Sequence, residues 1–515
     1  MAYLDILLPT FVALGSHLIF RKREPDPLQF IGFIGLTSSS IFFSLLFLGY
    51  CTQDCYLTII KAVLIYTTSL ILSILIYRHS PWHPLARFPG PAAAISTKWW
   101  MVHRILVKGG RHLELQRLHD KHGKWVRVGP NELSVCDPAA IRPIYNQLER
   151  APFYEGTPAK ADSLITVRDR LRHTERRHIW SKAVTGSAIK DYEPFAMNRA
   201  KQLLSCIAKE DVVNMDKWLY LFFMDLMGDM GFQGGFETMK AGKDEEGWMD
   251  MLTLGVIFVS AMGQVPWLKR IIQLLPQRGP VESFHTFTKE KVNEIRAQQS
   301  SGVLRKDILS SLLDESIGKI RLSDEEAAAD ASLIVVAATD TSVQAVITFL
   351  RYPGFRASRV SGCVYTRVSS DYPPGPFGPP RTTGRNGAFI LDTWVPPNTT
   401  LHVPVYAVHR DPRYFGILSN KWIPERWIPE NNDVDLKPCN RDAFVPFSSG
   451  YSSCVGKHLA LRNIKILLAY LLKAYDIYPS PSFDVDIYDQ SFKEYGLWSH
   501  DPLLVQVKLR DSSLE

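Results

Sequence analysis

The residue with the clearest chemical potential is Cys454, in the C-terminal part of the 515-residue chain. It lies in a loop rich in Ser and Gly and directly precedes an apolar stretch, which predicts a helix over 455–475. The free N–H groups and the positive dipole end of such a helix stabilise a thiolate. A thiolate placed in this way suits axial ligation of a haem iron, although a lone cysteine at the start of a helix is more often a small buried residue.

Three further residues of the same loop strengthen the interpretation as a metal ligand. Phe447 is placed to shield the sulfur from water, and Gly450 permits a positive φ in a tight loop. Gly456 lets a flat ligand approach the backbone. The complete spacing, Phe-x-x-Gly-x-x-x-Cys-x-Gly, is far more specific than the cysteine alone, and it favours Cys454 as the ligand of a haem iron.

A second candidate group lies in the middle of a long predicted helix. The capping box at 323–326 predicts a helix over Asp324–Leu350, about 40 Å long at 1.5 Å per residue. Asp340 and Thr341 place an acid and an alcohol in this helix after an apolar run. The alternative is an aspartate that faces solvent and a threonine that bonds back to a helix carbonyl, which is the usual fate of such residues.

A third group is basic and suits the two carboxylates of a buried haem, which Arg and His side chains must neutralise. His173 and Arg177 are four residues apart on a predicted helix and therefore face one way. Arg381 follows the proline-rich turn 372–380 and is a third candidate. The alternative is that the cluster around His173 and Arg177 is a solvated helix face.

Residues 447–456 resemble the haem-binding loop of the cytochrome P450 monooxygenases. Residues 337–341 resemble the oxygen-activating stretch of the central helix of that family, and Glu425-Arg426-Trp427 resembles its segment between the last sheet and the haem loop. The stretches at 87–91, 372–374 and 409–412 also fit, in the right order. The resemblance covers essentially residues 80–510, with one gap, and is closest in character to the fungal P450s of secondary metabolism.

The resemblance implies a mainly α fold with small β-sheets, preceded by N-terminal transmembrane helices. It implies haem b ligated by Cys454, with Asp340 and Thr341 relaying protons to bound dioxygen. His173, Arg177 and Arg381 are then the candidates that contact the haem propionates. The family usually has Arg or His shortly before the cysteine, whereas this chain has Tyr-Ser-Ser at 451–453. One propionate contact of the family pattern is therefore absent.

The resemblance also implies partners and a reaction. An NADPH–cytochrome P450 reductase supplies the electrons, and one oxygen atom of O2 enters a lipophilic small molecule. Residues 205–260 are expected to line its pocket. A haem-thiolate isomerase of peroxides and a non-catalytic, truncated P450-like membrane protein are the alternatives. There is no glycine-rich nucleotide loop, no zinc-ligand spacing and no basic patch that indicates nucleic acid, since the net charge of +7 is spread along the chain.

One element of the family pattern is missing. The Glu-x-x-Arg helix, whose ion pair joins the arginine of the Glu425–Trp427 segment, should lie shortly before Tyr372, but no Glu occurs between 327 and 424. Residues 352–371 are instead rich in Gly, Ser and Arg and are typical of a linker, which indicates a lost exon or a retained intron. Without its partner Arg426 is expected to be an unpaired buried charge, at a cost of about 3–5 kcal/mol, and haem retention is expected to be weak.

The first 77 residues contain only eight of the 111 charged side chains. Three apolar stretches, about 1–20, 28–50 and 56–77, have the length of bilayer spans and predict a transmembrane anchor. A signal peptide is the alternative for the first, but Asp5 stands where a basic residue is expected and two more spans follow. The three basic residues at 21–23 place the N-terminus in the lumen of the endoplasmic reticulum and the catalytic domain in the cytosol.

Two loop cysteines, Cys51 and Cys55, would then face an oxidising compartment, where pairing and two free thiols are equally open. A proline-rich hinge at 78–92 is expected to join the anchor to a catalytic domain over 93–515, with 352–371 as its aberrant segment. Within that domain, we expect an amphipathic surface helix that ends at Gly123 and carries three surface histidines with no metal, His112, His119 and His122. A strand pair over 125–135 and helices over 218–230 and 250–262 follow.

Overall fold

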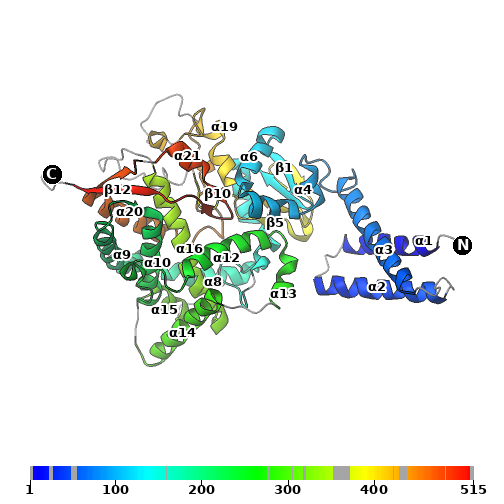
Figure 1. The fold of residues 1–515 in the computed structure, drawn as a ribbon, viewed down its shortest axis with the longest axis horizontal. Coiled ribbons are helices and arrows are strands. Elements are labelled where there is room, and N and C mark those ends of the chain that lie inside the picture. Colours follow the sequence, from blue (N-terminus) through cyan, green and yellow to red (C-terminus); the bar gives the residue numbers. More distant parts are fainter. Residues whose placement is uncertain are drawn as a thin grey trace.

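Figure 1 shows the computed structural model of the chain, a mostly helical body from which three N-terminal helices extend on one side. The structure describes residues 4–21, 27–47, 55–157, 159–274, 279–303, 306–316, 320–351, 372–421, 423–427, 438–481 and 483–510. The aberrant segment 352–371 and Cys51 lie outside the described residues, as do the side chains of Cys55 and Glu425.

The helices of the described residues begin with α1 (Leu4–Phe20), α2 (Pro27–Phe47), α3 (Cys55–His79), α4 (Ala92–Ser96), α5 (Trp99–His103), α6 (Arg111–His122) and α7 (Ile141–Gln147). The helical body continues with α8 (Arg170–Ala183), α9 (Gly186–Ile207), α10 (Met215–Phe232), α11 (Thr238–Ala241), α12 (Trp248–Met262), α13 (Lys269–Ile272), α14 (Pro280–Ser300), α15 (Ile308–Leu313) and α16 (Asp324–Leu350). The C-terminal part adds α18 (Val405–His409), α19 (Pro412–Phe415), α20 (Lys457–Ala474) and α21 (Val485–Gln490).

The β-structure is confined to small sheets. The largest has the strand order β1-β2-β8-β5-β3, formed by β1 (Trp125–Gly129), β2 (Glu132–Val135), β8 (Thr400–His402), β5 (Arg381–Thr382) and β3 (Glu149–Arg150). The others are β4-β12-β9 (Val213–Asn214, Leu504–Leu509, Tyr475–Pro479), β10-β11 (Lys493–Glu494, Trp498–Ser499) and β6-β7 (Ala388–Ile390, Thr393–Val395). The predicted fold class is therefore confirmed, and so is the strand pair over 125–135.

The three N-terminal helices pack on one another, with the closest packing between α1 and α3. Polar side chains bridge these two helices. Thr10 lies 3.4 Å from Ser69, the Tyr66 hydroxyl donates to Ser16 at 3.0 Å, and the His17 Nδ1 atom lies 2.6 Å from the Ser73 hydroxyl. The first and last of these pairs ascend both helices together, so α1 and α3 run in the same direction. We call these side chains the polar seam of the anchor.

By length and hydropathy, two helices among the described residues are able to cross a bilayer, Leu57–His79 of α3 and Asp324–Leu350 of α16. Two-thirds of the apolar window of α16 is buried inside the body, whereas 17% of that of α3 is buried. Helix α16 is therefore the core of the catalytic domain. The apolar stretches of α1 and α2 are shorter than a full span within the described residues, at Ile6–Phe20 and Leu28–Ser44.

Helix α16 is the central element of the body. Its capping box is present, because the Ser323 hydroxyl accepts from the Glu326 N–H group and the Glu326 carboxylate accepts from the Ser323 N–H group. Helices α10 and α14 pack closely along it, and α9 and α20 pack on one another beside it in the same apolar core. The bounds predicted for this helix are confirmed.

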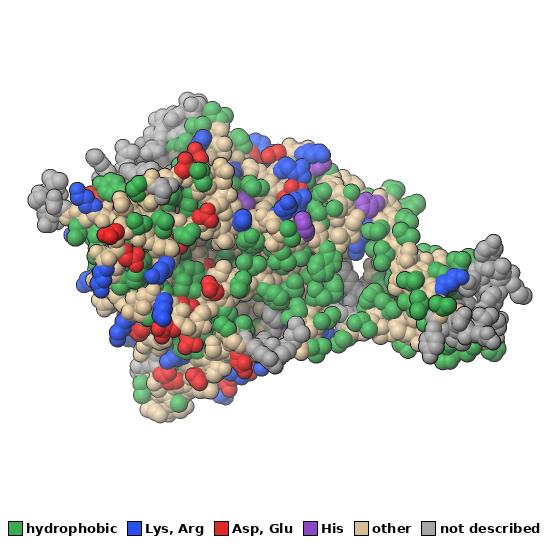
Figure 2. Space-filling model, viewed as in Figure 1, with side chains coloured by type: hydrophobic (Ala, Val, Ile, Leu, Met, Phe, Trp, Pro, Cys, Tyr) green, Lys and Arg blue, Asp and Glu red, His purple; other side chains and the backbone are tan. Residues whose placement is uncertain are grey.

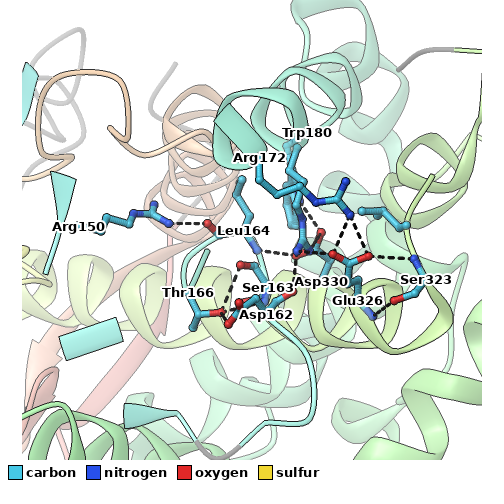
Figure 3. A network of polar contacts seen from close by, with 12 residues as sticks. Arg150, Asp162, Ser163, Leu164, Thr166, Arg172, Trp180, Ser323, Glu326 and Asp330 are labelled. Atoms are coloured by element: carbon cyan, nitrogen blue, oxygen red, sulfur yellow. Dashed lines mark hydrogen bonds and ion pairs between the residues drawn. The ribbon is translucent and has the colours of Figure 1, made fainter. Parts of the chain in front are cut away.

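A network of polar contacts fastens α8 to the first half of α16 (Figure 3). The Arg176 guanidinium and the Asp330 carboxylate form a fully buried ion pair at 2.6 Å. The Asp330 carboxylate also accepts from the Leu164 N–H group at 2.7 Å and from the Trp180 indole at 3.1 Å. Nearer solvent, Arg172 forms an ion pair with Glu326 at 2.9 Å. These contacts fix how the side chains of α8 are presented to the rest of the domain.

Three sequence-based expectations are corrected by the structure. The predicted surface helix is α6, but His112 and His119 are buried. His119 lies 2.8 Å from both the Gly123 carbonyl oxygen and the Ser134 hydroxyl, and the His112 ring packs between Tyr406 and Trp498. Segments distant in sequence cover both rings. That the three histidines bind no metal stays a prediction.

Leu85 and Phe88 of the proline-rich segment are buried in the core beside the large sheet. The second correction concerns Arg426. The buried Arg426 guanidinium donates to the carbonyl oxygens of Phe415 and Leu418, the latter at 2.7 Å. The expectation of an unpaired charge is therefore wrong, because backbone carbonyls solvate the guanidinium. The third correction is minor: the helix after Cys454 begins at Lys457 rather than at 455.

Candidate functional site

The loop 447–456 is held by its own backbone and by helix α7. The Cys454 N–H group donates to the Phe447 carbonyl at 3.0 Å, and the Ser453 N–H group donates to the Gly450 carbonyl at 3.1 Å. Gly450 has φ +78°, and a Cβ atom there would lie 2.2 Å from the Tyr145 carbonyl oxygen. Only glycine fits this position, so the predicted role of Gly450 in a tight loop is borne out by its conformation.

The Cys454 thiol is accessible to solvent although it lies deep in the domain. This depth raises the pKa of the Cys454 thiol above its ordinary value, whereas the Gly456 N–H group and the charges of Arg177 and Lys457 act in the opposite direction. A Cβ atom added to Gly456 meets nothing within 4 Å. The backbone beside the sulfur is therefore open to a ligand, as a flat group bound at Cys454 requires.

Two arginines from distant elements reach this loop. Arg177 of α8 donates to the Ser453 carbonyl at 2.5 Å and to its hydroxyl at 3.3 Å. Arg381 of β5 donates to the Ser452 hydroxyl. The serines that replace the basic residues of the family pattern are thus the acceptors that bring Arg177 and Arg381 to the loop.

His173 and Arg150 complete a cationic cluster at this position. The Arg150 Nη2 atom lies 3.1 Å from the His173 Nε2 atom, and the His173 ring packs edge-on against Tyr451 at 5.6 Å. Burial, followed by the charges of Arg150 and its neighbours, lowers the pKa of His173 to about 3. The ring is therefore neutral, and because Arg150 can only donate, the proton of the ring lies on Nδ1.

The cluster has no carboxylate of its own. Arg150 and Arg381 are both buried and lie directly opposite one another where β3 pairs with β5. Two like charges in this position repel each other and destabilise the strand pair. Within the described ranges no Asp or Glu forms an ion pair with Arg150, Arg177 or Arg381. The Nε atoms of Arg150 and Arg381 and the Nδ1 atom of His173 are buried without a hydrogen-bond partner.

These unpartnered donors fit a dianion with two carboxylates, such as haem. The predicted candidates His173, Arg177 and Arg381 are therefore brought together with the loop, and the alternative of a solvated helix face does not hold for His173, which is 1% exposed. Sequence reasoning missed Arg150. No local signal marks it, since its role comes from the cross-strand pairing with Arg381.

Asp340 and Thr341 lie in the middle of α16 and have separate partners. The Thr341 hydroxyl donates to the Ala337 carbonyl at 2.6 Å, so it bonds back to its own helix. Asp340 does not face solvent: its Oδ1 atom accepts a hydrogen bond from the Tyr220 hydroxyl of α10. Burial raises the pKa of Asp340 to about 7. Within the part of the chain that is described, no hydrogen bond or ion pair joins either residue to the loop of Cys454.

An open stripe interrupts the burial of α16. Ala337 is exposed and Thr341, one turn later on the same face, is half-buried, although residues 342–350 that follow are buried. The open stripe therefore lies in the middle of the helix, between two buried stretches. The small side chain of Ala337 leaves room at this stripe for a planar group.

The family model described as Cytochrome P450 matches residues 91–351 and 372–503. This chain belongs to the cytochrome P450 family. The two matched stretches omit 352–371, the segment that departs from the family pattern. P450 proteins bind haem through a cysteine thiolate and act as monooxygenases with electrons from a redox partner, so this chain is a haem monooxygenase.

Named relatives from fungi are similar over nearly the whole P450. The protein named Cytochrome P450 67 of Uromyces fabae is 28% identical over 542 aligned positions, which cover 96% of this chain and 97% of the relative. The Tryprostatin B 6-hydroxylase of Aspergillus fumigatus is 28% identical, covering 87% of this chain and 85% of the relative. The Cytochrome P450 monooxygenase lcsK of Purpureocillium lilacinum is 27% identical over 95% of both chains. The first alignment is longer than this chain, so the relative contains residues that this P450 lacks.

Proposed function

We propose that this P450 is an endomembrane monooxygenase of fungal secondary metabolism that inserts one oxygen atom of O2 into a lipophilic small molecule. The observation that carries the proposal is the loop of Cys454 beside a cationic cluster that lacks a carboxylate partner. Haem supplies the binding and reductive activation of dioxygen.

Cys454 would hold the haem iron through its sulfur, with Phe447 shielding that sulfur and Gly456 leaving the backbone open to the macrocycle. The depth that raises the pKa of the thiol disfavours a free thiolate, so binding to iron is what keeps the sulfur ionised. His173, Arg150, Arg177 and Arg381 hold the propionates, each by donating N–H groups. Thr341 and Asp340 would hold and pass protons beside the open stripe of α16.

The proposed substrate reaches the site from a membrane. Figure 2 shows hydrophobic side chains gathered on the anchor and on the part of the body beside it. Exposed apolar residues of α12 and of the turns before and after α13 include Leu254, Trp267 and Leu274, exposed to 64%, 46% and 74%. A bilayer that receives α3 would cover this surface as well. Residues 205–260, which include α10 and α12, are proposed to line the pocket.

The proposed location is the membrane of the endoplasmic reticulum, with the catalytic domain in the cytosol and an NADPH–cytochrome P450 reductase in the same membrane as the electron donor. The same direction of α1 and α3 agrees with an N-terminus on the opposite side from the body. Residues 1–77 act as a three-span anchor, residues 78–92 as the connection and residues 93–515 as the catalytic domain.

The direct test is the variant Cys454→Ala. We expect microsomes that contain it to lose product formation and the reduced-carbonyl spectrum of a thiolate-ligated haem, because the iron loses its protein ligand. The variant Cys439→Ala is the matched control, since Cys439 is a half-buried free cysteine outside the loop and should leave both unchanged. Unchanged product formation in Cys454→Ala would exclude the proposed ligand.

A second candidate is a truncated P450 that holds little haem, and the interruption of the family match at 352–371 favours it. Sequencing the transcript across codons 345–375 distinguishes a true chain from an altered one. Stoichiometric haem with a normal thiolate spectrum in the chain as written would exclude this candidate.

A further inference from the structure

The surroundings of Asp340 differ from those of the other buried acid on the same helix. Asp330 accepts hydrogen bonds from a backbone amide, an indole and a guanidinium, so its carboxylate is fully held. Asp340 accepts from the Tyr220 hydroxyl alone within the described part of the chain, and its Oδ2 atom is buried without a partner. One acid of α16 is therefore locked in place, and the other depends on a single tyrosine.

Tyr220 has a second contact. Its hydroxyl oxygen lies 3.3 Å from the hydroxyl of Thr253, and the three side chains come from α10, α12 and α16. A phenol has one proton to donate, and the Asp340 carboxylate takes it. Thr253 must therefore donate to Tyr220. The hydrogen bonds run in one direction, from α12 through α10 to the carboxylate of α16.

We propose that Tyr220 is a positioning residue for Asp340, and that Thr253 and Tyr220 form a hydroxyl chain that orients the acid and connects it to α12. The inference rests on the proposed role of Asp340 in proton handling and adds to it the group that fixes the acid. Without Tyr220 the carboxyl group loses the hydrogen bond that sets its orientation, since no other hydrogen bond to either oxygen is found within the described residues.

The position of Asp340 affects which product the reduced oxygen forms. A productive turnover converts substrate, O2, two electrons and two protons into hydroxylated product and water, with the electrons supplied by NADPH through the reductase. When the protons are not delivered in the way that productive turnover requires, the same O2, two electrons and two protons form hydrogen peroxide, and the substrate stays unchanged. A misplaced Asp340 therefore changes the ratio of product to peroxide without preventing the oxidation of NADPH.

The first test measures this ratio in Tyr220→Phe. We expect the product formed per NADPH oxidised to fall about fivefold, the effect of losing one hydrogen bond, with a matching rise in peroxide and unchanged haem content. Thr253→Val should show a smaller change in the same direction. Tyr475→Phe is the control, because the Tyr475 hydroxyl donates to the Leu204 carbonyl at 3.1 Å, away from Asp340.

The second test does not depend on activity. A hydroxyl that donates to a carboxylate favours its ionised form, so its removal should raise the protonated fraction of Asp340 near pH 7. Subtracting the infrared spectrum of an Asp340→Asn variant isolates the carboxylic acid C=O band of Asp340. This band should be larger in Tyr220→Phe, measured against Tyr220→Phe/Asp340→Asn, than in wild type, measured against Asp340→Asn. The same measurement on Thr253→Val serves if Tyr220→Phe fails to fold, and there the expected shift is smaller.

Three outcomes would overturn the inference. A wild-type product ratio and infrared band in Tyr220→Phe would show that the tyrosine does not hold the acid. Equal losses in Tyr220→Phe and Tyr475→Phe would show a general effect on folding. A wild-type product ratio in Asp340→Asn, with the band of Tyr220→Phe still shifted, would remove the proton role proposed for Asp340 and leave only a structural contact.

Discussion

At the scale of single residues, two groups of buried polar atoms carry the chemistry, and they are organised in opposite ways. Around Cys454 four cationic or neutral donors converge, and several of their N–H groups are buried without partners. Around Asp340 a single donor is present among the residues that the structure describes. The first arrangement is suited to binding an anion in a fixed position, because its buried N–H groups need negatively charged acceptors. The second is suited to a mobile proton, because the carboxyl group is held at only one of its oxygen atoms.

The cationic cluster predicts that Arg150 contributes to haem binding. We expect Arg150→Gln to lower haem affinity about tenfold, since a charge-assisted hydrogen bond to a propionate contributes more than a neutral one. Arg150→Lys should retain part of that affinity because it keeps the charge. The measurement is the rate of haem transfer to an apo-haemoprotein acceptor.

Arg168→Gln is the control for Arg150, because Arg168 lies near it in the fold and pairs with Glu155 outside the cluster. Equal losses in the Gln and Lys variants of Arg150 would contradict a charge interaction. They would indicate instead that Arg150 acts through its hydrogen bonds to the carbonyl oxygens of Leu164 and Val167.

Asp340 predicts a dependence of stability on pH. Its pKa is about 7 in the folded chain and about 4 when unfolded, so the folded state keeps a proton that the unfolded state releases. Stability should therefore fall as the pH rises from 4 to 7 and then level off. Urea unfolding at pH 5 and pH 8 should show a smaller difference in unfolding free energy for Asp340→Asn than for wild type. An equal difference in both proteins would contradict the raised pKa.

At the scale of secondary-structure elements, the site depends on how α8 is fastened to α16. The buried pair of Arg176 and Asp330 joins the helix that carries His173 and Arg177 to the helix that carries Asp340 and Thr341 (Figure 3). Together with the ion pairs of Glu326 with Arg172 and Arg176, this pair sets the two groups of side chains relative to one another.

This junction predicts that Asp330→Asn is destabilising by up to about 3–5 kcal/mol, because it leaves the buried Arg176 charge with only the more distant Glu326 carboxylate, at 3.5 Å. Arg172→Gln, which breaks the partly exposed pair with Glu326, should cost at most about 1 kcal/mol. Urea unfolding followed by tryptophan fluorescence measures both. The double variant Arg176→Leu/Asp330→Leu should recover most of the stability, and a failure to recover would mean that the hydrogen bonds of Asp330 matter more than the charge.

The elements could be predicted from sequence where the signal is local. The capping box and apolar run fixed α16, and the spacing around Cys454 fixed the loop. Side-chain partners that come from distant segments could not be predicted. His112 and His119 looked like surface residues because Tyr406, Trp498 and Ser134, which cover them, lie elsewhere in the chain. Tyr220 looked like one more aromatic residue of an apolar helix.

At the scale of the whole molecule, hydrophobic side chains gather on the anchor and on the part of the body beside it (Figure 2). The body therefore does not depend on the helices alone for contact with lipid. The polar seam and the exposed residues of α12 and α13 lie on different parts of the chain, yet both belong to the part of the molecule nearest the proposed bilayer (Figure 1).

The orientation of the anchor gives a prediction of topology. Since α1 and α3 run in the same direction, an N-glycosylation acceptor added before residue 1 should be modified in the lumen. An acceptor added after residue 515 should stay unmodified. Glycosidase-sensitive shifts in gel mobility measure both. Modification at the C-terminal position would place the body on the other side of the membrane.

The polar seam has a consequence for replacing the anchor. Tyr66, Ser69 and Ser73 of α3 find their partners on α1, which leaves the ribosome earlier and is already in place when α3 follows. A foreign leader exchanged for α1 and α2 alone would leave these hydroxyls facing lipid tails. A chimera made for expression should therefore join the foreign sequence after His79, so that the two partner helices are kept together or removed together.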